Sequence, residues 1–309
     1  MKNILLLCLF FWGLLTDGSS ARAACNGLTL NSLAVATYDF ASGTAPSLIL
    51  TVAKANGSCN YFLTVGYGGA ADFSGRRIAQ GAYTIPMNIY KDVAHTQIVK
   101  DIPAATADTD VIVGNISGGA STSDSTYYPQ LGTAPTYNKF GNHTDSFVIK
   151  LYEGSITAAH TVKNLQTVTF NYFMPRVVDL SLVNTGGTFN IADTTQSMSF
   201  GNLVAGASQS FDIVLKYNAG YNVKLSSNNN GNLKHAALSD TVPYAITVNS
   251  VPVNLAGSST TPVSVASGAG VSSSTGLVLP STVTIGALGT ARSGTNYTDV
   301  ITFTVISTE

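Results

Sequence analysis

Short runs of alternating apolar and polar residues recur along most of the chain. They are separated by Gly, Asn, Ser and Pro, and turn signals return every eight to twelve residues or so, a spacing typical of all-β sandwiches. Evidence for helices is nearly absent, because the apolar positions follow a period of two rather than 3.6. Clear predicted strands in the first half lie at 47–54, 59–68, 83–92, 145–154 and 166–174.

The same theme starts again after Pro175. Both halves have an early Tyr-containing strand, then a Tyr-led strand followed by Asp or Asn, and finally an alternating strand. Pro175 cannot donate a backbone hydrogen bond to a sheet, so the domain boundary is expected beside it. The pattern predicts an all-β chain of two Greek-key sandwiches in tandem, over 24–175 and 176–309, after a leader at 1–23.

The last predicted strand lies within 296–307. Ile301, Phe303 and Val305 fall on one face of it, and threonines alternate with them on the other. Only a few residues follow. The pattern alone leaves open whether this strand closes a complete sandwich or stands next to a missing one.

Composition indicates an exported protein. Charged residues make up 10% of the chain, well below the roughly 25% of typical soluble domains. The formal net charge is −1, which gives no reason to expect nucleic acid as a partner. Lys2 and an apolar run at 4–15 form a secretory signal too short to span a bilayer, with a small-residue cleavage site after Ala23.

Cleavage removes Cys8 and leaves Cys25 and Cys59. In an exported compartment these two predict a disulfide. The alternative is a lipidated Cys25, which the charged Arg22 three places before it disfavours.

A long segment at 114–145 shows no convincing strand and is predicted to be a loop. It is rich in Ser, Thr and Gly, yet it carries several aromatic residues, which argues against simple disorder. These side chains are available either for binding a surface or for packing the loop onto the sandwich. A second Gly-rich loop is predicted at 66–77.

The sequence contains no recognisable catalytic or metal-binding pattern. The four histidines form no metal-ligand pair, and no nucleophile elbow or phosphate-binding loop is present. We therefore expect no enzyme activity, no cofactor and no metal. A hydrolase site assembled from distant residues is the alternative that a motif search cannot detect.

The second half resembles the spore coat protein U domain. The stretch 198–249 contains Phe-Gly, Tyr-x-Val-x-Leu-Ser, Gly-x-Leu and Pro-Tyr motifs, and 293–305 matches the family's closing Gly-x-Tyr-x-Asp and Val/Thr strand. The first half matches more loosely. One departure is clear: Lys216-Tyr217-Asn218 stands where the family carries a cysteine.

The resemblance implies a subunit of archaic (Csu-type) chaperone–usher pili. Such subunits are immunoglobulin-like sandwiches that lack one strand, which a periplasmic chaperone supplies before an adjacent pilin subunit replaces it at the outer-membrane usher. Two-domain members resemble tip adhesins at the cell surface, which attach cells to abiotic or host surfaces in biofilm formation. The resemblance thus implies that Ile301, Phe303 and Val305 line the donor-strand groove of the C-terminal domain.

The same resemblance places receptor binding on loops of the N-terminal domain, at the pole away from the pilin domain. Phe140 is expected in the core, and the 66–74 loop beside the binding segment. Cleavage after Ala23 leaves one residue before Cys25, so no donor arm is expected, which fits a tip position. A structural coat or matrix protein is the alternative function. The residues predicted to bind the receptor are Tyr127, Tyr128, Pro129, Leu131, Pro135 and Tyr137.

Overall fold

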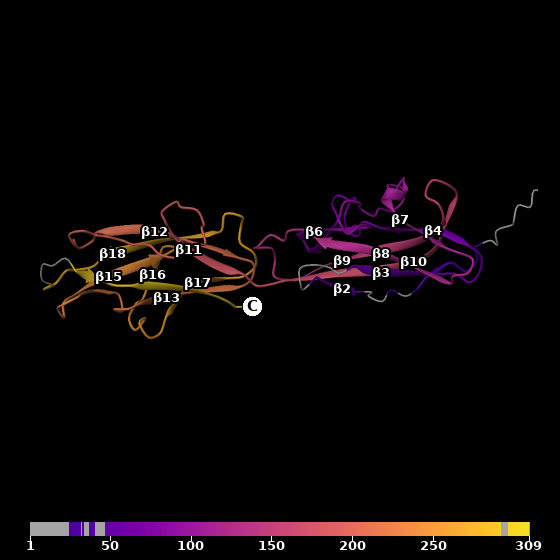
Figure 1. Cartoon of the computed structure of the whole chain (residues 1–309). Coiled ribbons are helices and arrows are strands. Elements are labelled where there is room, and N and C mark those ends of the chain that lie inside the picture. The colour runs from indigo at the N-terminus through magenta and orange to yellow at the C-terminus, as the bar shows by residue number, and fades with distance from the viewer. Residues whose placement is uncertain (1–24, 32, 34–36, 41–46, 292–295, 309) are drawn as a thin grey trace, which may run out of the picture.

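The computed structural model describes residues 25–31, 33, 37–40, 47–291 and 296–308. The predicted signal peptide lies outside this part of the chain. Two β-sandwiches follow one another end to end, an N-terminal sandwich that ends at Met174 and a C-terminal sandwich that begins at Val178 (Figure 1). The prediction of an all-β chain with two immunoglobulin-like sandwiches in tandem is confirmed.

In the N-terminal sandwich one layer holds β1, β3 and β8, and the other holds β7, β4, β9, β10 and β2; the β5–β6 hairpin joins them. A short 3-10 helix occupies Asp108–Asp110. The strands are β1 (Thr29–Leu30), β2 (Thr37–Asp39), β3 (Leu48–Ala53), β4 (Cys59–Val65), β5 (Arg77–Gln80), β6 (Tyr83–Tyr90), β7 (Ile112–Ile116), β8 (Thr122–Leu131), β9 (Gly141–Gly154) and β10 (His160–Met174).

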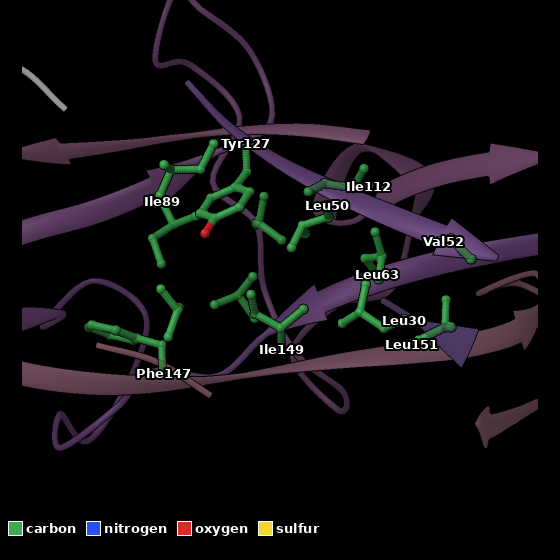
Figure 2. Packing of buried hydrophobic residues seen from close by; sticks show 14 of the residues in the cluster. Leu30, Leu50, Val52, Leu63, Ile89, Ile112, Tyr127, Phe147, Ile149 and Leu151 are labelled. Carbon is green, nitrogen blue, oxygen red and sulfur yellow. The ribbon is translucent and has the colours of Figure 1, made fainter. Parts of the chain in front are cut away.

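The core of this sandwich follows directly from the alternation in the sequence. Every second residue of β9 points inward, and Phe147, Ile149 and Leu151 are all 0% exposed. They face Leu50 and Tyr127 across the sandwich (Figure 2). Burial of such side chains stabilises the fold by roughly 1.5–3 kcal/mol each.

The outer edge of the N-terminal sandwich is covered by its own chain. The short strand β2 runs parallel to β10, with Phe170 opposite Tyr38, and the amide of Phe40 continues the pairing. Phe40 and Phe170 are both 0% exposed, and their rings lie 5.6 Å apart. This sandwich therefore closes its core without help from another molecule.

In the C-terminal sandwich one layer has the order β11-β12-β18-β15-β14-β19, with β16 beside β15, and the other has the order β17-β13-β20. The low-complexity stretch at 256–276 supplies the edge strand β17. The strands are β11 (Val178–Asn184), β12 (Ser208–Tyr217), β13 (Tyr221–Ser227), β14 (Asn232–His235), β15 (Thr241–Val248), β16 (Val251–Val253), β17 (Val263–Gly268), β18 (Leu277–Ile285), β19 (Tyr297–Thr298) and β20 (Ile301–Ser307).

Candidate functional site

The strand β20 has one free edge. It pairs along its whole length with β13, from Ser227 opposite Ile301 to Tyr221 opposite Ser307. Within the described ranges no strand pairs with its other edge. On that side β11 contacts β20, but the strand that pairs with β11 is β12, and the amide of Leu182 donates a hydrogen bond to the carbonyl of Asp193.

The side chains along this free edge are apolar and only half covered. Ile301, Phe303 and Val305 point into the core yet stay partly exposed, while the intervening Thr302 and Thr304 face solvent. From the other side, β11 adds three partly buried side chains to the same core, those of Val178, Leu180 and Leu182. The two strands thus border an apolar strip, which we call the β11–β20 groove.

The N-terminal sandwich provides an internal reference for this groove. There β9 pairs with β4 as β20 pairs with β13, and the next strand, β10, covers its second edge. The core-facing residues of β9 are fully buried as a result, whereas Phe303 is not. The difference between the two strands is the absence of a covering strand beside β20 in the described part of the chain.

A polar network anchors the start of β20. The carboxylate of Asp299 accepts hydrogen bonds from Tyr244 Oη (2.6 Å), Ser227 Oγ (2.5 Å) and the amide of Asn229 (3.0 Å). Burial, followed by the hydrogen bond to Asp299, raises the pKa of the Tyr244 phenol above its usual range. This network keeps the open strand in register even though one of its edges is free.

The disulfide prediction is confirmed, because Cys25 and Cys59 are bonded. The bond lies at the end of the N-terminal sandwich that points away from the C-terminal sandwich, where β4 begins. Three loops, at 54–58, 117–121 and 155–159, meet at this end, which we call the distal pole (Figure 1). The Lys54 ammonium joins two of them by donating to the carbonyls of Gly57 and Ser117.

The predicted loop at 114–145 is wrong as a description of secondary structure. More than half of it belongs to strands, namely the end of β7, all of β8 and the start of β9. Its buried positions include Ser125 and Pro129, which are not apolar strand formers, so the sequence of β8 shows no clear alternation. The hydroxyl of Tyr61 lies 3.0 Å from that of Ser125, which satisfies this polar side chain inside the sandwich.

The residues predicted to bind a receptor are divided among three environments. Tyr127 is 1% exposed and lies in the core between the layers, close to Ile89 (Figure 2), and burial raises the pKa of its phenol. Pro129 is buried as well, and Leu131 packs against the same core. Tyr128 lies on the outer face, next to Tyr90 and His95.

Pro135 and Tyr137 lie at the junction between the two sandwiches, not at the distal pole. Tyr137 Oη donates a hydrogen bond of 2.9 Å to Asp179, and burial together with this carboxylate raises the pKa of Tyr137 to about 12. The expected position at the far pole is therefore wrong for this part of the segment. A receptor-binding role for the exposed members of the set stays a prediction.

The Gly-rich loop at 66–77 is fixed by a buried arginine. Arg76 is 2% exposed and donates to the carbonyls of Val65 and Gly66 and to Asn88 Oδ1. Burial lowers the pKa of its guanidinium to about 9. The loop presents Tyr67, which is 43% exposed and packs edge-on against Phe73.

Phe140, expected in the core, is instead partly buried beside the junction and packs against Phe173. Among the described residues, no group of three or more His, Cys, Asp or Glu side chains is arranged to hold a metal ion. The described residues also include no helix that is long and apolar enough to cross a membrane.

No protein family and no curated protein matches the sequence. The solved structures whose backbone follows a similar path have low sequence identity to this chain. One is the chaperone–tip adhesion subunit pre-assembly complex CsuC–CsuE from archaic chaperone–usher Csu pili of Acinetobacter baumannii, with 14% identity over 91% of this chain and 99% of that chain and a TM-score of 0.39.

A second is the CupB6 tip adhesin from Pseudomonas aeruginosa, with 12% identity over 91% of this chain and 93% of that chain and a TM-score of 0.36. A third is a chaperone–tip adhesin complex of CFA/I fimbriae, with 9% identity over 89% of this chain and 97% of that chain and a TM-score of 0.34. At these values the three structures do not by themselves assign a function to this chain.

Proposed function

We propose that this protein is an exported adhesin subunit, joined to a pilus by a strand that another protein inserts into the β11–β20 groove. The observation that carries the proposal is the contrast between β9 and β20. Both strands present alternating apolar residues to a core, but only β9 has a neighbour on its second edge within the described residues. An exposed strand edge above an apolar strip is a template for pairing with an extended segment of another chain.

The occupant of the groove should be an extended peptide whose alternate side chains are apolar. Its backbone would pair with the free edge of β20, and its inward side chains would cover Ile301, Phe303 and Val305. In the setting that the sequence resemblance suggests, a periplasmic chaperone supplies this strand first and an adjacent pilin subunit replaces it at the outer-membrane usher. The tip position is proposed because the N-terminal sandwich is already complete and its predicted leader ends just before Cys25.

The adhesive surface is proposed at the distal pole, which lies farthest from the groove. Its exposed residues are small and uncharged, such as Gly118, Gly119 and Ala158. A surface of this kind suits neutral ligands or abiotic materials better than charged ones, since no exposed charge within the three loops would need to be desolvated. Tyr128 and the Tyr67–Phe73 pair lie away from this pole, on the side of the sandwich.

The deciding experiment adds a synthetic strand to the mature chain. A ten-residue peptide with alternating Val and Thr should bind, raise the melting temperature of the C-terminal sandwich and suppress aggregation. Phe303→Asp should abolish these effects, because it places a charge in the groove. Thr304→Asp is the matched control, since Thr304 faces solvent on the same strand.

A C-terminal sandwich that is stable and monomeric without any peptide, and that gains nothing from one, would contradict strand donation. It would favour the alternative of a self-contained coat or matrix protein. Amino-terminal sequencing of the exported protein tests the tip position separately. A long alternating segment ahead of Cys25 would mean that the subunit can also donate a strand and need not end the fibre.

A further inference from the structure

The segment at 132–140 bridges the two sandwiches. It connects β8 to β9 and is fastened to the N-terminal sandwich by Asn138, which is 5% exposed and donates from Nδ2 to the carbonyl of Thr84 at 3.0 Å. The ring of Phe140 packs edge-on against Phe173 near the end of β10, with centroids 5.5 Å apart. One side of this segment is therefore held by its own sandwich.

The other side of the segment is held by the C-terminal sandwich. Tyr137 donates its hydroxyl proton to Asp179, and the Lys216 ammonium lies 5.5 Å from the centre of the Tyr137 ring. Asp179 on β11 lies opposite Lys216 on β12 in the strand register. The ring of Phe189 also packs edge-on against the Tyr137 ring. Cation–π contacts of this kind contribute about 0.5–1 kcal/mol at exposed sites.

The short connection between the sandwiches is itself bonded on both sides. Asn218 is 2% exposed; its Nδ2 donates to the carbonyl of Pro175 (2.8 Å), and its Oδ1 accepts from the amide of Val177 (2.7 Å). Its backbone carbonyl accepts a hydrogen bond from the amide of Phe140 at 3.1 Å. Arg176 lies over the Phe140 ring at 4.5 Å. These bonds restrict rotation of the linker.

From these contacts we infer that the 132–140 segment is an intramolecular docking surface that holds the two sandwiches in one fixed orientation. This role accounts for Lys216-Tyr217-Asn218, the stretch where the sequence departs from the pattern of the spore coat protein U domain. Lys216 and Asn218 each contact the N-terminal sandwich or the linker, and Tyr217 packs against Tyr221 within its own sandwich. Tyr137 then belongs to the joint and lies away from any receptor.

Docking of the sandwiches depends neither on adhesion nor on strand donation, and it is tested by distances between two spin labels. Val93 (75% exposed) and Val251 (62% exposed) lie in different sandwiches and can be replaced by labelled cysteines without touching the joint. Double electron–electron resonance on the full mature chain should give one narrow distance distribution between the two labels. The measurement is made both without and with the Val/Thr peptide, so that failure of the peptide to bind does not affect the result.

The double variant Tyr137→Ser, Asn218→Ala should broaden the distribution at least twofold. Tyr67→Ser is the matched control, because Tyr67 is an exposed aromatic residue that the joint does not use, and it should leave the width unchanged. Tyr137→Phe, which removes only the hydroxyl, should broaden the distribution less and covers the case in which the double variant does not fold. A broad distribution in the unmodified chain, or equal widths in all the variants, would overturn the inference.

Discussion

The hydroxyl of Tyr244 donates a hydrogen bond of 2.6 Å to the carboxylate of Asp299, two residues before β20 begins. Tyr244 is 7% exposed, so its phenol keeps its proton to higher pH in the folded state than in the unfolded one. The stability that this hydrogen bond gives to the start of β20 therefore depends on pH in the alkaline range.

We expect the stability of the C-terminal sandwich to fall above about pH 10, the usual pKa of tyrosine. Below that pH both states are protonated and the contribution of Tyr244 is fully present. Above it the unfolded state releases the proton while the folded state retains it, which costs at most about 1.4 kcal/mol per pH unit until the raised pKa is reached.

Urea denaturation between about pH 7 and 11.5 measures this effect, with Tyr244→Phe as the comparison. The variant should be less stable at neutral pH by about 1.5–3 kcal/mol, because it loses a hydrogen bond to a charged group. Between neutral and alkaline pH, the free energy of unfolding of the variant should then fall by less than that of the unmodified chain. Parallel losses in both proteins would show that this phenol is not responsible.

Replacing Tyr127 tests whether this residue is structural. Tyr127→Ser should destabilise the N-terminal sandwich by about 3–5 kcal/mol, since it opens a cavity between the layers. Gln130→Ser, on the exposed face of the same strand, should change stability by less than about 0.5 kcal/mol. A soluble and equally stable Tyr127→Ser protein would contradict the placement of this ring in the core.

Removing the disulfide should destabilise the N-terminal sandwich alone. Cys25 and Cys59 are 34 residues apart, and closing a loop of this size contributes about 3–4 kcal/mol in the chain-entropy estimate. Cys25→Ser, Cys59→Ser should lower the thermal transition of the N-terminal sandwich and leave that of the C-terminal sandwich in place. If the C-terminal transition moved equally, the two sandwiches would be thermodynamically coupled.

Charge at the distal pole should reduce attachment. A side chain added at Gly118 or Gly119 would meet open space, and neither residue is held at positive φ, so Gly118→Asp, Gly119→Asp should fold normally. We expect adhesion to neutral surfaces to fall at least tenfold, because each carboxylate must be desolvated on contact. Ala256→Asp, at an exposed site of the C-terminal sandwich, is the control; equal adhesion of both variants would move the binding surface elsewhere.

The strands with strong alternation were predictable from the sequence. The β3, β4, β6 and β9 segments have inward apolar residues at alternate positions, and each lies within or overlaps a range expected to be a strand. The inward set Ile301, Phe303 and Val305 was predicted in the same way, and these three side chains do face the core. Alternation identifies the face of a strand, but it does not tell which molecule covers that face.

Two features could not be found in this way. The inward side of β8 carries Ser125 and Pro129, whose burial is possible only because Tyr61 supplies a hydroxyl partner and Pro129 needs no ladder donor. The position of Tyr137 depends on where the long β9–β10 hairpin ends relative to the linker. Both are tertiary properties, set by residues far away along the chain.

The β9–β10 hairpin has a mechanical consequence. Its strands pair from Gly141 opposite Met174 to Gly154 opposite His160, so they run from the joint to the distal pole, roughly 45 Å at about 3.3 Å per residue. A tensile force between the distal loops and Pro175 would act parallel to these strands. A force applied at the 54–58 loop would reach β10 through the β4–β9 and β9–β10 ladders, and it would load their hydrogen bonds together in shear rather than one pair at a time.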